Sequence, residues 1–487
     1  MKNIKKMLKQ DLESNIDVEL SFDKSLLTDN SKKYDRKRLR KKVAISVLSF
    51  SCCLMLCVIS VPLFASLDTK SSYKETKVKY SLNDLEVLEN RTFKKIGQVN
   101  YPSGERVKLS VDDKYYQAIN NFAYKIYQEL DDSDNISFSP ISLFSCLNMV
   151  SLASNTKEIS SLFDELLCIS DLSQEERIKN YLNMYKSDFF CNNYGTLQMF
   201  NSAFLTNSLD YNQDFVDQLV KYYSEVYQLD FNKDSDVSKM IDWIEKASNQ
   251  KDIVSKEDLD IKKDITSILF FSTMHFKNKW LSNYVNSKSY YRDFIMANNE
   301  TQRVKFMRHT YSGDMYDYDK YVSFYDYYQN DLKIKYIIPK DTEDLVYDVI
   351  GSTNFLFDDE AKKTRKIIDL SAPVFEKSSM LNFNDILKRI GLGEVYNPYG
   401  KALNKAFSNL KEDESIYLEY VKQNNRVSFS ESGTIVKTVT FASVGKDTSP
   451  SIIGDKDAIK IYLNRPYIYV IYDHNNLPLY IGNVDSI

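Results

Sequence analysis

The order of helix and strand patterns along the chain limits its fold more than any other feature. Helical spacing of apolar residues dominates residues 115–249, whereas roughly the last 75 residues carry strand patterns, which end with residues 467–472 and 479–484. So many strands in succession must pair with distant parts of the chain to complete their sheets. This segregation of helices and strands predicts an α+β domain.

The domain is expected to cover residues 112–487. Hydrophobic residues make up 43% of the chain and charged residues 27%, which is enough apolar surface for a substantial core. The expected helices are 115–130, one entered at Pro140, 157–167, 174–188, 212–224 and 234–249. The expected earlier strands are 197–205, 266–276, 322–328, 334–338 and 366–375.

The N-terminal region differs in character from the rest. Residues 1–42 are polar and end in a basic cluster, and residues 43–67 contain no charged side chain. As a helix, this uncharged segment would be about 37 Å long, enough to cross a hydrocarbon core of about 30 Å. We therefore expect a single-pass signal-anchor helix with a cytoplasmic N-terminus, a stalk at 68–111 and an extracellular domain. The alternative is a cleaved signal peptide, for which the leader is long.

Several functional classes have little support in the sequence. The net charge of -4 gives no signal for nucleic-acid binding. The six cysteines and three histidines show neither a disulfide framework nor metal-ligand spacing, and no catalytic motif accompanies them. We expect no enzyme activity, no metal and no cofactor.

The stretch from Ser430 to Tyr462 begins as a strand and continues as a polar, turn-prone loop. Its charged Lys437 falls on one face of the strand. The opposite face carries only uncharged β-branched residues, namely Thr434, Val436, Thr438 and Thr440. One face of this strand can therefore be buried without burying a charge.

Residues 115–487 resemble the serpin family in several motifs that occur in the family's order. These are Asn135–Ser142 (NISFSPIS), Asn201–Phe204 (NSAF), Tyr223–Ile244, Phe276–Trp280 (FKNKW), Ala372–Phe375 (APVF), Leu387–Gly391 (LKRIG), Glu431–Thr434 (ESGT), Asn464–Tyr467 (NRPY) and Leu479–Gly482 (LYIG). The resemblance implies a serpin fold with a large central mixed sheet, further sheets, surrounding helices and an exposed reactive-centre loop at about 431–460.

The same resemblance implies a serine-type endopeptidase inhibitor that acts as a suicide substrate. The target protease attacks the loop, remains attached as an acyl-enzyme, and is displaced when the loop inserts into the main sheet. The partner would be a serine protease or, as an alternative, a cysteine protease, and the inhibitor a monomer on a bacterial cell surface. Family members that inhibit usually have small residues after Gly433 and Thr434, whereas this chain has Ile435-Val436-Lys437. A non-inhibitory, serpin-fold binding or structural protein is therefore the alternative.

The resemblance also assigns residues to three regions of the mechanism. The hinge comprises Glu431, Gly433, Thr434, Val436, Thr438 and Thr440. The breach, where insertion begins, comprises Trp280 and Arg308, and we expect a Glu431–Arg308 ion pair there. The shutter comprises Ser139, Ser142, Ser272 and Gln423. Ser272 and Gln423 replace the family's usual Asn and His, and we expect them to be able to bond each other.

The position of the reactive bond follows from its usual distance to the hinge glycine. Counting from Gly433 gives Asp447–Thr448, and a loop shorter by one residue gives Lys446–Asp447. The loop is longer than usual, so cleavage after Ile452 or Ile453 is a further alternative. The target specificity therefore stays open.

Overall fold

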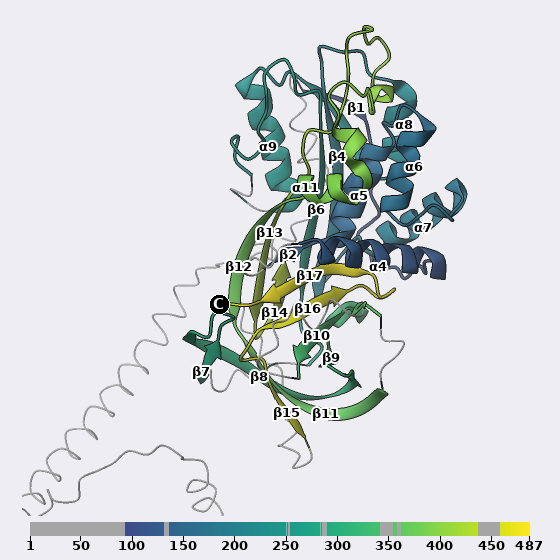
Figure 1. Ribbon diagram of the computed structural model, residues 1–487. Helices are drawn as coiled ribbons and strands as arrows, with labels where there is room; N and C mark the ends of the chain where they lie inside the picture. The colour runs from purple at the N-terminus through teal and green to yellow at the C-terminus, as the bar shows by residue number, and fades with distance from the viewer. Residues whose placement is uncertain are drawn as a thin grey trace, which may run out of the picture. The chain divides into compact units, whose positions relative to one another are not determined.

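Two β-sheets organise the protein in the computed structural model, which describes residues 93–130, 136–249, 251, 254–282, 284, 290–340, 354–357, 362–436 and 458–487 (Figure 1). All of these residues belong to one unit of the chain, Leu82–Ile487. In order across sheet A lie β1 (Lys94–Gly97), β5 (Ser224–Leu229), β4 (Gly195–Thr206), β6 (Ile268–Asn278), β14 (Gly433–Val436), β13 (Lys422–Ser430) and β12 (Phe375–Asn382), with β3 (Phe190–Cys191) paired to β4.

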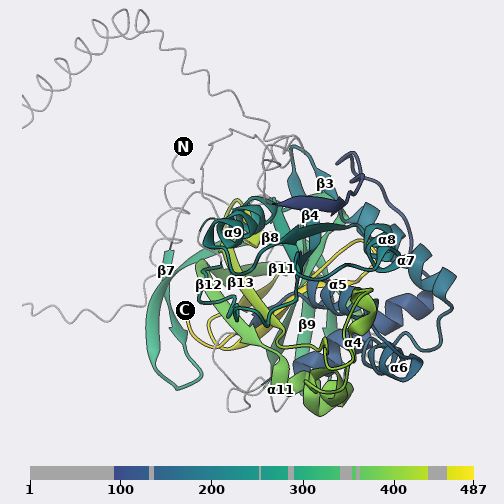
Figure 2. The same ribbon diagram turned by 90° about the horizontal axis from the view of Figure 1, so that it is seen from above.

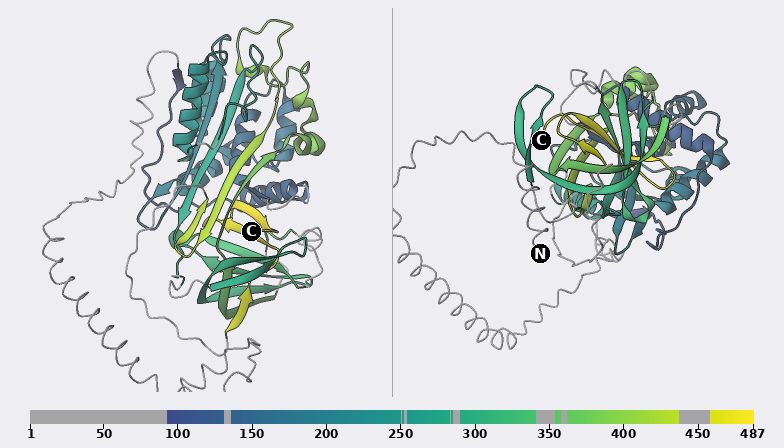
Figure 3. Two further views of the ribbon diagram at one scale, coloured as in Figure 1. Left: turned by 90° about the vertical axis from the view of Figure 1, so that its left-hand side faces the viewer. Right: turned by 90° about the horizontal axis from the view of Figure 1, so that it is seen from below.

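Sheet B is built mainly from the C-terminal half of the chain. Its order is β15 (Ile459–Tyr462), β11 (Lys362–Pro373), β8 (Thr301–Asp317), β9 (Tyr321–Tyr327), β10 (Lys333–Pro339), β16 (Tyr467–Tyr472), β17 (Pro478–Val484) and β2 (Ser137–Phe138), with β7 (Tyr290–Ile295) paired to β8. In the left view of Figure 3, the long strands of sheet A run lengthwise and the curved strands of sheet B lie at one end. Both sheets are mixed, because β4–β5 and β11–β15 are parallel pairs.

The helices cover both faces of sheet A. They are α4 (Asp113–Gln128), α5 (Pro140–Ser151), α6 (Lys157–Leu166), α7 (Gln174–Ser187), α8 (Gln213–Lys221), α9 (Asp234–Ser248) and the short α11 (Asn384–Leu387). Helical turns occur at Gln329–Asp331, Lys388–Leu392, Gly393–Tyr396 and Asn404–Ala406. Helices α5 to α8 gather on one side of sheet A and α9 lies on the other (Figures 1 and 2).

Helix α5 is the central helix of the core. Pro140 occupies its first turn, and the Ser139 side chain caps it by accepting a hydrogen bond from the Ser142 N–H at 3.2 Å. Nearly every side chain of α5 is buried, since the helix packs against β6 on one side and β17 on another. Such all-round burial explains why its sequence is mostly apolar and why its polar residues are only serine and asparagine.

The structure revises three predictions about organisation. Residues 93–111 are not a free stalk, because β1 pairs with β5, and Phe93 and Val99 are buried. The helix predicted at 212–224 ends at Lys221, and Ser224 begins β5.

The third revision concerns localisation. The prediction of a membrane-anchored protein with an extracellular domain is contradicted, since no helix in the described part of the chain is long and apolar enough to cross a membrane. The segment 43–67, on which that prediction rested, lies outside the described residues.

Candidate functional site

The hinge strand β14 is seated between the two central strands of sheet A. It runs antiparallel to both neighbours, with Thr434 opposite Phe429 of β13 and opposite Asn278 of β6. Thr434 and Val436 are buried at 0% and 1% exposure, and Ile435 between them is partly exposed. The alternation that the sequence predicted is therefore present in these three residues.

Gly433 allows the hinge to enter the sheet. Its φ of +145° lies in a region that residues with a side chain rarely adopt. A Cβ at this position would lie 2.1 Å from the backbone oxygen of Asn278. The close approach of β14 to β6 thus depends on the missing side chain.

Trp280, assigned to the breach, contacts one end of the hinge turn directly and is connected to the other end through Tyr328. Its Nε1 donates to the Ser430 carbonyl oxygen at 2.8 Å, and its ring stacks on Tyr328 with a centroid distance of 4.4 Å. The Tyr328 hydroxyl in turn donates to Thr434 Oγ1 at 2.7 Å. The buried threonine hydroxyl is therefore satisfied when the hinge is seated.

Glu431 pairs with Lys305 and not with Arg308, which corrects the predicted ion pair. Lys305 Nζ lies 2.5 Å from Glu431 Oε1. Arg308 instead makes a two-pronged contact with Asp369 on β11, with 2.7 Å between Arg308 Nε and Asp369 Oδ1. Partial burial, the largest single cause, favours a raised pKa for Glu431. The hydrogen bond from Lys305, a backbone hydrogen bond and the Lys305 charge together outweigh it, so the pKa is lowered overall.

The strand register explains why Lys305 is the partner. The Lys305 carbonyl accepts from the Val374 N–H at 2.9 Å, at the point where the chain passes from β11 into β12. Phe375, which follows, pairs with Phe429 on β13, directly before the hinge turn. Lys305 is thus brought to the end of β13, whereas Arg308 lies farther along β8, next to β11.

The shutter residues form a network that differs from the predicted one. The Gln423 side chain bonds both backbone groups of Ser139, accepting from its N–H at 2.7 Å and donating to its carbonyl at 3.1 Å. Ser139 Oγ donates to Ser142 Oγ at 3.1 Å. Asn425, which the sequence-based assignment missed, donates to Gln423 Oε1 at 3.1 Å and to the Ser137 carbonyl at 2.9 Å. Ser272 does not bond Gln423, and its buried hydroxyl has no partner among the described residues.

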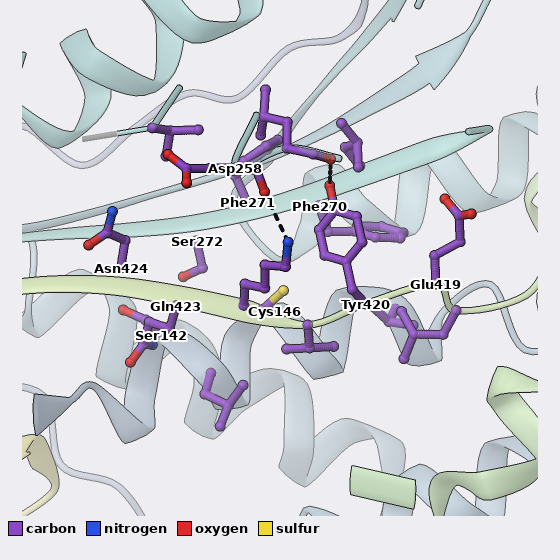
Figure 4. Close-up of a pocket in the computed structure, with 18 of the residues that line it drawn as sticks. Ser142, Cys146, Asp258, Phe270, Phe271, Ser272, Glu419, Tyr420, Gln423 and Asn424 are labelled. Carbon is purple, nitrogen blue, oxygen red and sulfur yellow. Dashed lines mark hydrogen bonds between the residues drawn. The ribbon is translucent and has the colours of Figure 1, made fainter. Parts of the chain in front are cut away.

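Residues of β6 and β13, the two neighbours of the hinge strand in sheet A, line a cavity of about 200 Å³. Among the described residues these two strands form no ladder with each other, since each pairs with β14. Ser272, Gln423 and Cys146 are among the lining side chains (Figure 4). Burial raises the pKa of the Cys146 thiol to about 12, so it stays protonated and unreactive at neutral pH.

Most of the described chain matches a known protein family. The family model described as Serpin (serine protease inhibitor) matches residues 117–487. The chain belongs to the serpin family. Alpha-1-antiproteinase of Ovis aries is 24% identical over 387 residues, which cover 75% of this chain and 86% of that protein. Serpin B11 of Mus musculus is 21% identical and covers 77% of this chain and 100% of its own length.

Solved serpin structures share the fold. The thermophilic serpin tengpin in its native state has a TM-score of 0.66 at 21% identity, over 82% of this chain and 100% of tengpin. Tengpin in its latent state has a TM-score of 0.63 at 21% identity, over 78% of this chain and 100% of that one. The homologous inhibitors support a serine protease inhibitor role for this serpin.

Several predicted site residues of this serpin lie outside the described residues. They are the hinge residues Thr438 and Thr440 and the reactive-bond residues Lys446, Asp447 and Thr448. Sequence reasoning missed Lys305, Tyr328 and Asn425. No sequence motif links Lys305 to Glu431 or Asn425 to Gln423, because these contacts depend on strand register.

Replacing Lys305 with alanine is expected to loosen the hinge, and replacing Arg308 with alanine is expected to leave it unchanged. The Lys305–Glu431 pair is partly exposed, so the loss of stability should be about 1 kcal/mol or less. Because the pKa of Glu431 is lowered, this contribution is present above pH 4.5, the ordinary glutamate value, and is lost as the pH falls below it. Amide hydrogen exchange of β14 measures the effect, and equal exchange in the two variants would contradict the pairing.

Two hydrogen bonds connect the cavity-lining end of β13 to the chain between α9 and β6. The Tyr420 hydroxyl donates to the Leu259 carbonyl, and Lys422 Nζ donates to the Asp258 carbonyl at 3.2 Å. A Tyr420→Phe/Lys422→Met variant lacks both bonds. The free energy needed to separate β13 from β6 should then fall by about 1–3 kcal/mol. Loop insertion should then be faster. The exposed Tyr399→Phe serves as control, and an unchanged insertion rate in the double variant would count against these bonds as restraints.

Proposed function

We propose that this serpin inhibits a serine-type endopeptidase as a suicide substrate, by insertion of its reactive loop into sheet A. The observation that carries the proposal is the position of β14, which already occupies the start of a strand between β6 and β13. Both ladders of a new central strand have thus begun. Insertion would extend them residue by residue.

The register of β14 supports this path for the rest of the hinge. Continued without a shift, it would bring Thr438 level with Met274 and Asn425. It would then bring Thr440 level with Ser272 and Gln423. The uncharged face of the loop would thus meet the shutter residues, while Lys437 would point to the opposite face.

Ser272 gives this path an energetic reason. Its hydroxyl is buried without a partner, which costs about 1–3 kcal/mol. A threonine hydroxyl arriving between Ser272 and Gln423 would offer a donor and an acceptor at that place. Insertion would then satisfy a polar group that has no partner among the described residues of the uncleaved protein.

Bulky side chains at the first hinge positions do not prevent the hinge from entering sheet A. Thr434 and Val436 are both β-branched, and both fit between β6 and β13 with almost no exposed surface. This fit supports the inhibitor over a non-inhibitory binding protein. The alternative remains an outcome of the experiment below.

In the proposed reaction the serine hydroxyl of the protease adds to the carbonyl carbon of Asp447. The Asp447–Thr448 bond breaks, Thr448 leaves as an amine that carries the proton, and Asp447 stays bound as an ester. Insertion of the cleaved loop would then deform the protease before water hydrolyses the ester. This serpin supplies the substrate and the motion, and the protease supplies the catalytic groups.

Incubation of the full chain with a panel of proteases tests the proposal. The panel contains Asp-directed, trypsin-like and chymotrypsin-like serine proteases and cysteine proteases. We expect a complex with one serine protease that survives SDS and is lost when the protease's nucleophile is blocked beforehand. Cleaved serpin without any such complex would support the non-inhibitory alternative.

The same reaction identifies the reactive bond. Sequencing the N-terminus of the released C-terminal fragment should give Thr448 with an Asp-directed target, or Asp447 with a trypsin-like one. A fragment that begins after Ile452 or Ile453 would move the bond into the loop extension. Asp447→Ala should then abolish the complex only with an Asp-directed target.

A further inference from the structure

A second group of chemically active side chains lies apart from the hinge. Asp188, directly after α7, meets Asp473 and His474 in the turn between β16 and β17. One ligand atom of each lies within 4.8 Å of the others. Asp188 and Asp473 are buried at 3% and 1% exposure, and His474 is largely buried.

Asp188 lacks the partners that a buried carboxylate requires. Both of its oxygens are inaccessible, and no donor among the described residues reaches them. The one hydrogen bond open to Asp188 is with the Asp473 carboxyl group, which requires a proton shared between the two acids. The nearby Arg106 does not supply one, because its NH1 donates to the Ser187 carbonyl at 2.5 Å and its NH2 to the Asn330 carbonyl at 3.1 Å. An unsatisfied carboxylate in the interior points to an occupant such as an ion.

His474 is held in the neutral tautomer whose Nδ1 can bind a metal. Its Nε2 lies 3.2 Å from the Leu109 carbonyl oxygen, which can only accept, so Nε2 carries the proton. Nδ1 then keeps its lone pair. This atom is buried without a hydrogen-bond partner and lies 3.9 Å from Asp473 Oδ2. A backbone carbonyl on the far nitrogen is the usual second contact of a metal-binding histidine.

Asp473 is fixed by its own turn. Its Oδ1 accepts from the N–H groups of Asn475 at 2.9 Å and Leu477 at 2.7 Å. These bonds hold the carboxylate so that Oδ2 faces His474. The turn therefore presents two preoriented ligands, and Asp188 brings the third from a distant part of the chain.

We propose that Asp188, Asp473 and His474 bind a divalent transition metal, with Zn²⁺ as the best-suited ion. One imidazole nitrogen and two carboxylates match zinc better than magnesium or calcium, which prefer oxygen ligands alone. With metal–ligand bonds of about 2.0–2.2 Å, tetrahedral ligand atoms lie about 3.4 Å apart. The His474–Asp473 pair, now at 3.9 Å, would therefore close by roughly half an ångström, and a pair at the 4.8 Å limit by about 1.4 Å. The ion would join α7 to the β16–β17 turn and, through His474, to the segment around Leu109.

A proton shared by the two carboxyl groups is the competing occupant. Burial raises the pKa of Asp188 well above its ordinary value and that of Asp473 to about 7, so one of them can stay protonated. Both occupants would relieve the buried charge. Only the metal would depend on the His474 ring and on the ion supplied.

The test is Zn²⁺ binding to the full chain after removal of metals with EDTA. Calorimetry should find one more Zn²⁺ in the wild type than in Asp188→Asn or His474→Gln, or an affinity higher by about tenfold or more. Zn²⁺ should also raise the melting temperature of the wild type but not that of Asp188→Asn or His474→Gln. Mg²⁺ and Ca²⁺ should have no effect, and Asp331→Asn, an exposed carboxylate near the site, should behave like the wild type.

Equal Zn²⁺ stoichiometry and affinity in all four proteins would overturn the proposal. Stability that changes with pH but not with Zn²⁺ would also overturn it, in favour of the shared proton. If the variants fail to fold, X-ray absorption at the zinc edge of the wild-type complex decides. Nitrogen and oxygen ligands with one imidazole would support the site, and sulfur ligands would assign the zinc to cysteines.

Discussion

Replacing Thr434 with arginine is expected to convert the inhibitor into a substrate. Thr434 is fully buried in the hinge strand, and its hydroxyl accepts a hydrogen bond from Tyr328. A guanidinium there would be buried without a partner, at a cost of several kcal/mol. Since each 1.4 kcal/mol slows a step about tenfold, hydrolysis would overtake insertion. The number of serpin molecules consumed per protease inhibited should rise about tenfold or more.

Ile435→Arg is the matched control for this prediction. Ile435 neighbours Thr434 but lies on the opposite, partly exposed face of β14. The same charge would remain in water there, so inhibition should be close to that of the wild type. Equal losses in the two variants would show that the burial of one face does not govern insertion.

Replacing Gly433 with alanine is expected to expel the hinge strand from sheet A. The new Cβ would meet the Asn278 carbonyl at 2.1 Å, and backbone atoms cannot yield as a side chain can. The variant should also lose the Tyr328–Thr434 hydrogen bond, and its unfolding free energy should fall by about 2–4 kcal/mol. Fluorescence of Trp280, measured with Trp243 replaced by Phe, should change because its bond to Ser430 is disturbed.

Gly391→Ala is the control that distinguishes backbone strain at a positive φ from a steric clash of the new Cβ. Gly391 has a φ of +127°, but a Cβ there would have no atom within 4 Å. The unfolding free energy of this variant should fall only by the cost of the strained backbone conformation, about 1–2 kcal/mol. Its Trp280 fluorescence should stay unchanged. If Gly433→Ala were no worse than Gly391→Ala, the contact with Asn278 would not limit seating of the hinge.

The part of the site that depends on local sequence could be predicted. Strand alternation places Thr434 and Val436 on one face wherever the strand lies, and both are buried. Pro140 likewise predicted the start of α5, which is confirmed. Such features need only neighbouring residues.

The partners of these residues could not be predicted in the same way. Lys305 and Arg308 are three positions apart on one strand, and only the register of β8 with β11 decides which one reaches Glu431. Gln423 was expected to contact a side chain, but an amide can bond a backbone N–H and carbonyl together, as it does at Ser139. Side-chain identity alone does not distinguish these possibilities.

The segment at 93–111 shows a third limit. Its polar composition predicted a linker, yet β1 pairs with β5, and Arg106 bonds backbone carbonyls of Ser187 and Asn330. Edge pairing of this kind uses backbone groups, which leave little mark on the side-chain pattern.

The central claim is that the loop of this serpin completes sheet A after cleavage. Thermal unfolding of the full chain, before and after cleavage of the loop by a non-target protease, tests it most directly. About ten inserted residues, each adding hydrogen bonds worth about 0.5–1.5 kcal/mol, should raise the melting temperature by about 10 °C or more. An unchanged melting temperature after complete cleavage would contradict insertion.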